Sequence, residues 1–152
     1  MNNKILMIVN SFPPSGESGV QRPVKFLKYF ARDGWDTFVI TPRKPVMLKN
    51  MDASLEQEIP DSTKVFKTGS LGIREDKLTE VRFELEEAKS LWKTLTWKVV
   101  KLLNDIIFPF DKQIGWVPFA FIKAIRVIRK YRIRNIYITA SPFSAFICGI
   151  ML

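Results

Sequence analysis

Residues 4–42, KILMIVNSFPPSGESGVQRPVKFLKYFARDGWDTFVITP, decide the fold. They open on an apolar run without alternation, 4–9, which is typical of a strand buried on both faces of a parallel sheet. After a loop with two glycines, apolar residues recur at helical spacing over 20–32, and WDTFVIT then forms a second strand. A strand–helix–strand unit with such short connections is expected to be parallel and right-handed.

The helix predicted over 20–32 has one apolar stripe and a clear end. Val20, Val24 and Leu27 fall on the same side of it. Pro23 lies in the predicted first turn, where the missing N–H costs nothing. Gly34 is expected to end the helix, because glycine readily takes the left-handed conformation at that position.

Two further strands are predicted later in the chain, KVFKT at 64–68 and RNIYITA at 134–140. Helices are predicted over 91–108 and 117–131, and Ser141 followed by Pro142 is typical of a helix start. In a doubly wound sheet the fourth strand lies beside the first, which gives a Rossmann-like parallel α/β sheet with strand order 3-2-1-4. Because IYI has no lysine or proline to protect a sheet edge, we expect this sheet to be part of a larger one.

The composition limits the chemistry that these residues can perform. The 152 residues include one cysteine and no histidine, which excludes histidine general bases, Ser-His-Asp triads and the usual zinc ligand sets within them. The apolar runs are shorter than the roughly 17–25 residues of a membrane-spanning helix. The apolar run near the amino terminus is also too short for a secretory signal. We therefore expect a cytoplasmic chain whose chemistry depends on carboxylates, hydroxyls, backbone N–H groups or a bound cofactor.

The charge is concentrated in the second part of the chain. Of the net charge of +9, residues 91–152 supply +8, with ten Lys and Arg against two Asp and Glu. Such a balance favours an anionic partner, and no helix-turn-helix, RNA-binding aromatic pattern or zinc spacing supports nucleic acid. Over 91–108, Trp92 and Trp97 alternate with lysines. A helix with a solvated lysine face is the first interpretation, and a peripheral position on an anionic membrane is the second.

The loop PPSGESGVQR carries the candidate binding residues. Gly16 and Gly19 allow a ligand to approach the backbone, and N–H groups around 18–21 would sit at the positive end of the helix dipole. Arg22 would add a full charge, so a phosphate or a sugar hydroxyl suits this place. A turn that merely needs glycine is the alternative, but the carboxyl end of a central strand favours a ligand. The spacing matches neither a Walker loop nor G-x-G-x-x-G, which disfavours simple ATPase and dehydrogenase functions.

Two segments of the sequence resemble the N-terminal domain of glycosyltransferases of the GT-B, family 4-like group. In that group a strand leads into PP with a Gly-rich loop, often followed by GxxR, and then a helix, a GW turn and a second strand, as in residues 5–42. PFDKQIGW (109–116) before a helix and IYITASPFSAFICGI (136–150) supply a second match in the same order. Together the two segments extend over nearly the whole chain.

The resemblance implies retaining transfer of a hexose from a nucleotide-sugar to a glycan or lipid-linked acceptor in cell-envelope polysaccharide synthesis, without a bound metal or cofactor. It also implies that residues 1–152 belong to the N-terminal, acceptor-side domain, the incomplete first half of a GT-B fold. With the C-terminal nucleotide-sugar domain absent, the chain is expected to be inactive alone. The residues expected at the donor diphosphate, the acceptor and the cleft are Gly16, Ser18, Gly19, Arg22, Ser141 and Ser144.

Two alternatives stay open from the residues themselves. Asp111, in a predicted loop between Phe110 and Lys112, is a candidate base or acceptor-orienting group, although capping or turn formation is its first interpretation. The competing function for the whole chain is a basic Rossmann-like module that docks on an anionic membrane or on a partner chain.

Overall fold

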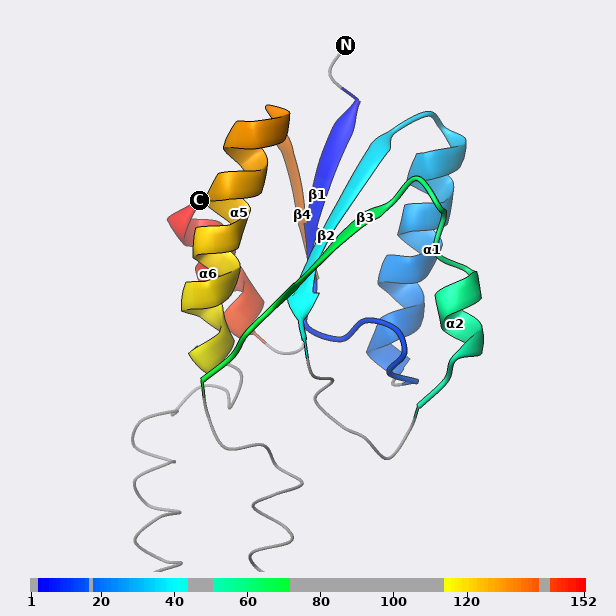
Figure 1. Cartoon of the computed structure of the whole chain (residues 1–152), viewed down its shortest axis with the longest axis horizontal. Coiled ribbons are helices and arrows are strands. Elements are labelled where there is room, and N and C mark those ends of the chain that lie inside the picture. Colours follow the sequence, from blue (N-terminus) through cyan, green and yellow to red (C-terminus); the bar gives the residue numbers. More distant parts are fainter. Residues whose placement is uncertain (1–2, 17, 44–50, 72–113, 140–142) are drawn as a thin grey trace, which may run out of the picture.

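The computed structural model describes residues 3–16, 18–43, 51–71, 114–139 and 143–152. In chain order its elements are β1 (Lys4–Ile8), α1 (Ser18–Arg32), β2 (Asp36–Pro42), α2 (Ser54–Gln57), β3 (Lys64–Thr68), the 3₁₀ turn η1 (Ile114–Trp116), α5 (Val117–Tyr131), β4 (Asn135–Ile138) and α6 (Ser144–Met151). Figure 1 shows them as three layers, a sheet between two layers of helices.

The four described strands form one parallel sheet in the order β3-β2-β1-β4. This confirms the predicted α/β class, the Rossmann-like arrangement and the strand order. β1 is an interior strand, with Ile8 opposite Ile40 of β2 on one side and Ile138 of β4 on the other. Because β1 is central and covered on both faces, its residues are apolar without alternation, as the sequence pattern indicated.

Helix α1 covers one face of the sheet, and α5 and α6 cover the other (Figure 1). Alternate residues of β1 point into two separate cores: Met7 packs among α1 side chains, whereas Leu6 and Ile8 pack among those of α5 and α6. The core residues that α1 contributes are Val20, Val24 and Leu27, as its sequence pattern predicts.

Helix α1 begins at Ser18, two residues before its predicted start. The prediction that Pro23 lies in the first turn is therefore wrong, because Pro23 is the sixth helical residue and lies in the second turn. Without an N–H at this position, the carbonyl oxygen of Gly19 does not receive the usual helical bond from four residues ahead. The side chain of Pro23 is fully buried.

The predicted end of α1 at Gly34 is confirmed. Gly34 has a φ of 76°, and the Trp35 N–H donates back to the Phe30 carbonyl at 2.9 Å. A side chain at this φ would be strained, so glycine is needed here for its backbone conformation.

The start of the last helix differs from its prediction. Helix α6 begins at Ser144, with Phe143 before it, rather than at Pro142. The predicted cap Ser141, the candidate Asp111 and the helix over 91–108 lie outside the described residues. Among the helices that are described, none combines the length and the apolar character needed to cross a bilayer.

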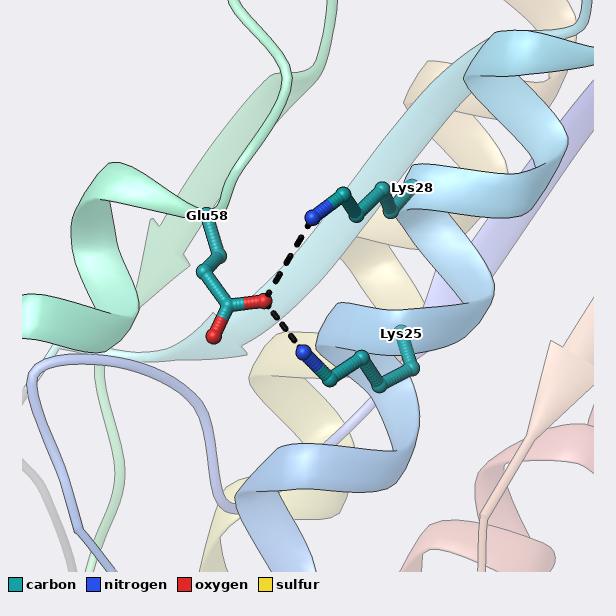
Figure 2. A network of polar contacts seen from close by, with 3 residues as sticks. All are labelled: Lys25, Lys28 and Glu58. Atoms are coloured by element: carbon teal, nitrogen blue, oxygen red, sulfur yellow. Dashed lines mark hydrogen bonds and ion pairs between the residues drawn. The ribbon is translucent and has the colours of Figure 1, made fainter.

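The short helix α2 is fastened to α1 by an ion-pair network at its carboxyl end. Glu58 Oε2 lies 2.5 Å from the Lys25 ammonium and 3.9 Å from that of Lys28. Figure 2 shows both lysines reaching from α1 toward this one carboxylate oxygen. The hydrogen bond from Lys25 lowers the pKa of the Glu58 carboxyl below its ordinary value.

Candidate functional site

The candidate site lies at the carboxyl ends of β1 and β4. Here the strand order changes direction, because β2 and β3 lie on one side of β1 and β4 lies on the other. β1 leads into α1 on one face of the sheet, whereas β4 leads toward α6 on the opposite face. The two strands are direct neighbours, with Ile8 opposite Ile138. Open α/β sheets bind ligands outside the carboxyl ends of their strands at this kind of topological switch point.

The first turn of α1 presents backbone groups at this switch point. Its N–H groups have no carbonyl partner within the helix, and they lie at the positive end of the helix dipole. Gly19 has ordinary helical φ and is exposed, and a Cβ built on it would meet no other atom within 4 Å. Neither backbone conformation nor packing within the described chain requires glycine at this position. The open space beside Gly19 is thus available to a ligand.

Helix α1 contacts β4 by way of Phe26. Gly19, Arg22 and Phe26 follow one another at spacings of three and four residues along α1. The ring of Phe26 contacts that of Tyr137 in β4, with 5.2 Å between their centroids. Arg22 is exposed and lies two residues from both Val20 and Val24, so its side chain leaves the helix on the side away from the sheet.

Three buried polar residues occupy the same end of the sheet. Asn10 follows β1, Ser15 lies in the loop that leads to α1, and Ser144 opens α6; each is at most 3% exposed. Among the described residues, Ser15 Oγ has no hydrogen-bond partner. A buried hydroxyl without a protein partner is a group that a ligand or a water molecule would satisfy.

Sequence reasoning missed Asn10 and Ser15. The signal for Asn10 was a polar residue directly after an unbroken apolar strand, which places it at the carboxyl edge of the sheet. No comparable signal marks Ser15, because its burial depends on residues distant in sequence: Ser15 pairs with Met51 in an isolated bridge, and the Asp52 N–H donates to the Pro14 carbonyl at 2.8 Å.

The predicted site residues divide into three groups. Gly16 lies in the loop and Arg22 in α1, as the sequence predicts, whereas Ser18 and Gly19, which were predicted in the loop, are the first two residues of α1. Ser144 lies in the first turn of α6 after the neighbouring strand and is buried. Ser141 and Asp111 lie outside the described residues, so their proposed roles stay predictions.

Asp52, whose backbone N–H bonds to this loop, has a carboxylate that bonds within its own turn. Asp52 Oδ1 accepts hydrogen bonds from the backbone N–H of Ser54 at 2.9 Å and from its hydroxyl at 2.5 Å. The bond from the Ser54 hydroxyl, followed by the backbone bond, lowers the pKa of the Asp52 carboxyl. Within the described ranges no three His, Cys, Asp or Glu side chains gather as metal ligands would.

The tryptophan of the late motif has a structural position. Trp116 is fully buried, and its indole N–H donates to Thr68 Oγ1 at the end of β3 at 2.7 Å. Thr68 Oγ1 in turn donates to the Thr41 carbonyl of β2 at 3.3 Å. The IGW segment therefore fastens the start of α5 to the ends of β2 and β3.

Comparisons of the chain with protein-family models, with curated proteins and with solved structures found no match.

Proposed function

We propose that this chain is the acceptor-side part of a two-domain glycosyltransferase that uses a nucleotide-sugar donor. The observation that carries the proposal is Gly19, an exposed helical glycine at the switch point for which the described chain itself has no need. The resemblance of residues 5–42 to family 4-like enzymes supports the same assignment. In this proposal the second, nucleotide-sugar domain is supplied from outside the 152 residues, and the chain alone is inactive.

The chemistry proposed for these residues is stabilisation of negative charge. When a sugar leaves its nucleotide diphosphate, charge develops on the departing phosphate oxygens. Fixed N–H donors at a helix start stabilise such charge without reorganising. The first-turn N–H groups of α1 would donate hydrogen bonds to one of these oxygens, and Arg22 would add a mobile charge beside it. The transfer is proposed to proceed with retention of configuration and without a bound metal, as the family resemblance implies.

The experiment titrates the chain with inorganic pyrophosphate and with a nucleotide-sugar, following backbone amide shifts. We expect weak binding with shifts centred on 16–22, and at least a tenfold loss of affinity in Gly19→Leu, whose side chain fills the open space. Gly19→Leu should fold normally and gain about 0.5–1 kcal/mol from removal of a helical glycine. The matched control is Gln21→Leu, in the same turn and also exposed.

A second glycine separates a ligand role from a backbone role. Gly34→Ala places a methyl group at a φ of 76° and should cost about 1–2 kcal/mol of folding free energy, with pyrophosphate binding unchanged. Wild-type affinity in Gly19→Leu, or shifts that leave 16–22 unaffected, would remove the site on which the proposal stands.

Docking on an anionic membrane is the second candidate function, and the exposed side of α5 favours it. Ile122 is 50% exposed on a stripe that continues to Arg126 and Arg129. Residues 114–139 contain no Asp or Glu. Sedimentation with phosphatidylglycerol vesicles, against phosphatidylcholine vesicles as the control, tests it. Binding that ignores lipid charge and salt would exclude it.

A further inference from the structure

The two edges of the described sheet have opposite protection. β3 presents two exposed lysines, Lys64 and Lys67, along its length. β4, with the sequence NIYI, has neither lysine nor proline, and Ile136 is 40% exposed on it. Among the described strands β4 pairs with β1 alone, so the backbone N–H and C=O groups on its outer edge have no strand partner. Such an edge readily accepts another strand.

The helices on both faces of β4 also expose apolar side chains. Phe26 of α1 contacts Tyr137, which places the Phe26 side chain over one face of β4. On the other face α6 lies close to the strand, because a Cβ on Gly149 would fall 2.0 Å from Ile138 Cδ1. We call the following set the β4 side: the outer edge of β4 with Ile136, together with the exposed Phe26 of α1 and the exposed Phe146 and Ile150 of α6.

The layering of the β4 side indicates what kind of partner fits it. Ile150, at 86% exposed, is the most exposed of the large apolar side chains described. A strand added beside β4 would lie between the α1 layer and the α6 layer, so it must be apolar on both faces. The described strands are all parallel, which favours the same direction for the added strand.

Charge adds a further condition and disfavours a second copy of this chain. Residues 114–139 and 143–152 contain six Lys and Arg and no Asp or Glu, and Arg134 directly precedes β4. Elsewhere in this sheet a basic strand start lies opposite an acidic one, Lys4 opposite Asp36. A second copy has the same net charge of +9 and offers no carboxylate from these two segments.

We propose that the β4 side binds a β-strand of a partner polypeptide that runs parallel to β4, is apolar on both faces and carries a carboxylate at its amino end. The proposal goes beyond sugar transfer and does not depend on it. The partner's backbone bonds to the outer edge of β4, its apolar side chains cover those exposed on α1 and α6, and its carboxylate meets Arg134.

The experiment adds a strand of this chemistry to the intact chain. The added strand has the sequence WDTFVIT, which is that of residues 35–41. In its native position this segment runs parallel to β1, is largely apolar and has an aspartate near its amino end. It is appended after Leu152 through a flexible linker of about ten Gly and Ser residues, which gives a high effective concentration at β4. Hydrogen exchange of the 136–138 amides and light scattering are then measured. One control tail replaces its aspartate by lysine, and another replaces its valine and isoleucine by serine.

The acidic tail should slow exchange of the outward-facing β4 amides at least tenfold in a monomer. The lysine tail should protect them less, and added salt should narrow that difference. The serine tail should give no protection, and Ile136→Lys should weaken protection by the acidic tail. Three results would overturn the proposal: no protection by the acidic tail, equal protection by the serine tail, or an unmodified chain that is already a dimer with protected β4 amides. Faster exchange in native β2 would mean strand replacement and would also count against it.

Discussion

The two edges of the sheet are secured in different ways. At the β3 edge, Lys64 and Lys67 are exposed, and the Lys64 ammonium lies over the rings of Phe38 and Tyr131. A buried chain of hydrogen bonds, Trp116 to Thr68 to Thr41, fastens the strand ends to α5. At the β4 edge the contacts are apolar, and the helix that covers the strand, α6, leaves large side chains exposed. The comparison teaches that, among the described residues, polar contacts hold the β3 edge whereas the β4 edge exposes apolar side chains, and only the β4 edge is proposed to bind a further strand.

The largest effect is expected from removing the anchor of the β3 edge. Trp116→Ala deletes the largest of the fully buried side chains that the structure describes and should lower the free energy of unfolding by about 3–5 kcal/mol. Trp116→Phe keeps most of the volume and loses the bond to Thr68, so about 1 kcal/mol is expected. Denaturant titration measures both, with the half-buried Trp35→Ala as control. A cost for Trp116→Ala no greater than for the control would mean that the β3 edge is not anchored this way.

The second largest effect is expected from ionisation of Cys148, which tests whether water reaches the buried side of α6. Burial raises the pKa of the Cys148 thiol to about 11, from 9.0 in the unfolded chain. The folded thiol stays neutral where the unfolded one ionises, so its contribution is fully present below pH 9.0 and is lost as the pH rises toward 11. The loss is about 2–3 kcal/mol. Stability measured from pH 8 to 11 should fall more steeply for the wild type than for Cys148→Ala. Parallel curves would mean that water reaches the thiol.

A smaller change in the free energy of unfolding, under about 1 kcal/mol, is expected when lysine is added to the β4 edge or removed from the β3 edge. Ile136→Lys gives β4 a lysine, and Lys64→Thr with Lys67→Thr removes both from β3. High salt screens the net charge and should promote association of the wild type through β4. Light scattering should show less association in Ile136→Lys and more in the double variant. If Ile136→Lys associates as the wild type does, the β4 edge is not the exposed one.

The smallest effect is expected at the α1–α2 contact. The lowered pKa of Glu58 means that its pair with Lys25 contributes stability above the ordinary carboxyl pKa, and this is lost as the pH falls through the lowered value. Glu58→Gln should therefore differ slightly from the wild type at pH 6 and converge with it in acid. Thermal unfolding at several pH values measures this, with the exposed Glu56→Gln as control. A difference that persists in acid would assign the effect to packing.

Most of the fold is predictable from local pattern. The apolar run of β1 indicated an interior strand, and the switch-point rule placed β4 beside it. The bounds of α5 agree with the predicted 117–131 because its apolar period continues to both ends. The start of α1 was missed because Ser18 and Gly19 carry no apolar periodicity. The start of α6 was misplaced because Ser141-Pro142 is a strong local signal, and periodicity could not show that the helix begins two residues later.

The candidate site was less predictable than the fold. Its glycines and Arg22 follow from their place after a central strand, which depends only on order along the chain. The burial of Ser15 and the anchoring of Trp116 depend on contacts with Met51 and Thr68, which no local pattern encodes. Sequence reasoning thus named the loop, the first turns of α1 and Ser144 of the candidate site, and it missed the buried Asn10 and Ser15.

The three long helices begin at the same rim of the sheet, and this arrangement decides which mutations can test the proposed site. Helices α1, α5 and α6 begin at the carboxyl ends of the strands, and none has a carboxylate in its first turn (Figure 1). At the opposite rim, cations offset the helix ends: Lys4 Nζ donates to the Tyr131 carbonyl at 3.2 Å, and Arg129 and Lys130 lie in the last turn of α5. An anion at the first rim would therefore meet peptide dipoles together with the Arg22 side chain. An alanine scan would remove only the contribution of Arg22, whereas the contribution of the dipoles would respond only to added bulk or to a broken first turn.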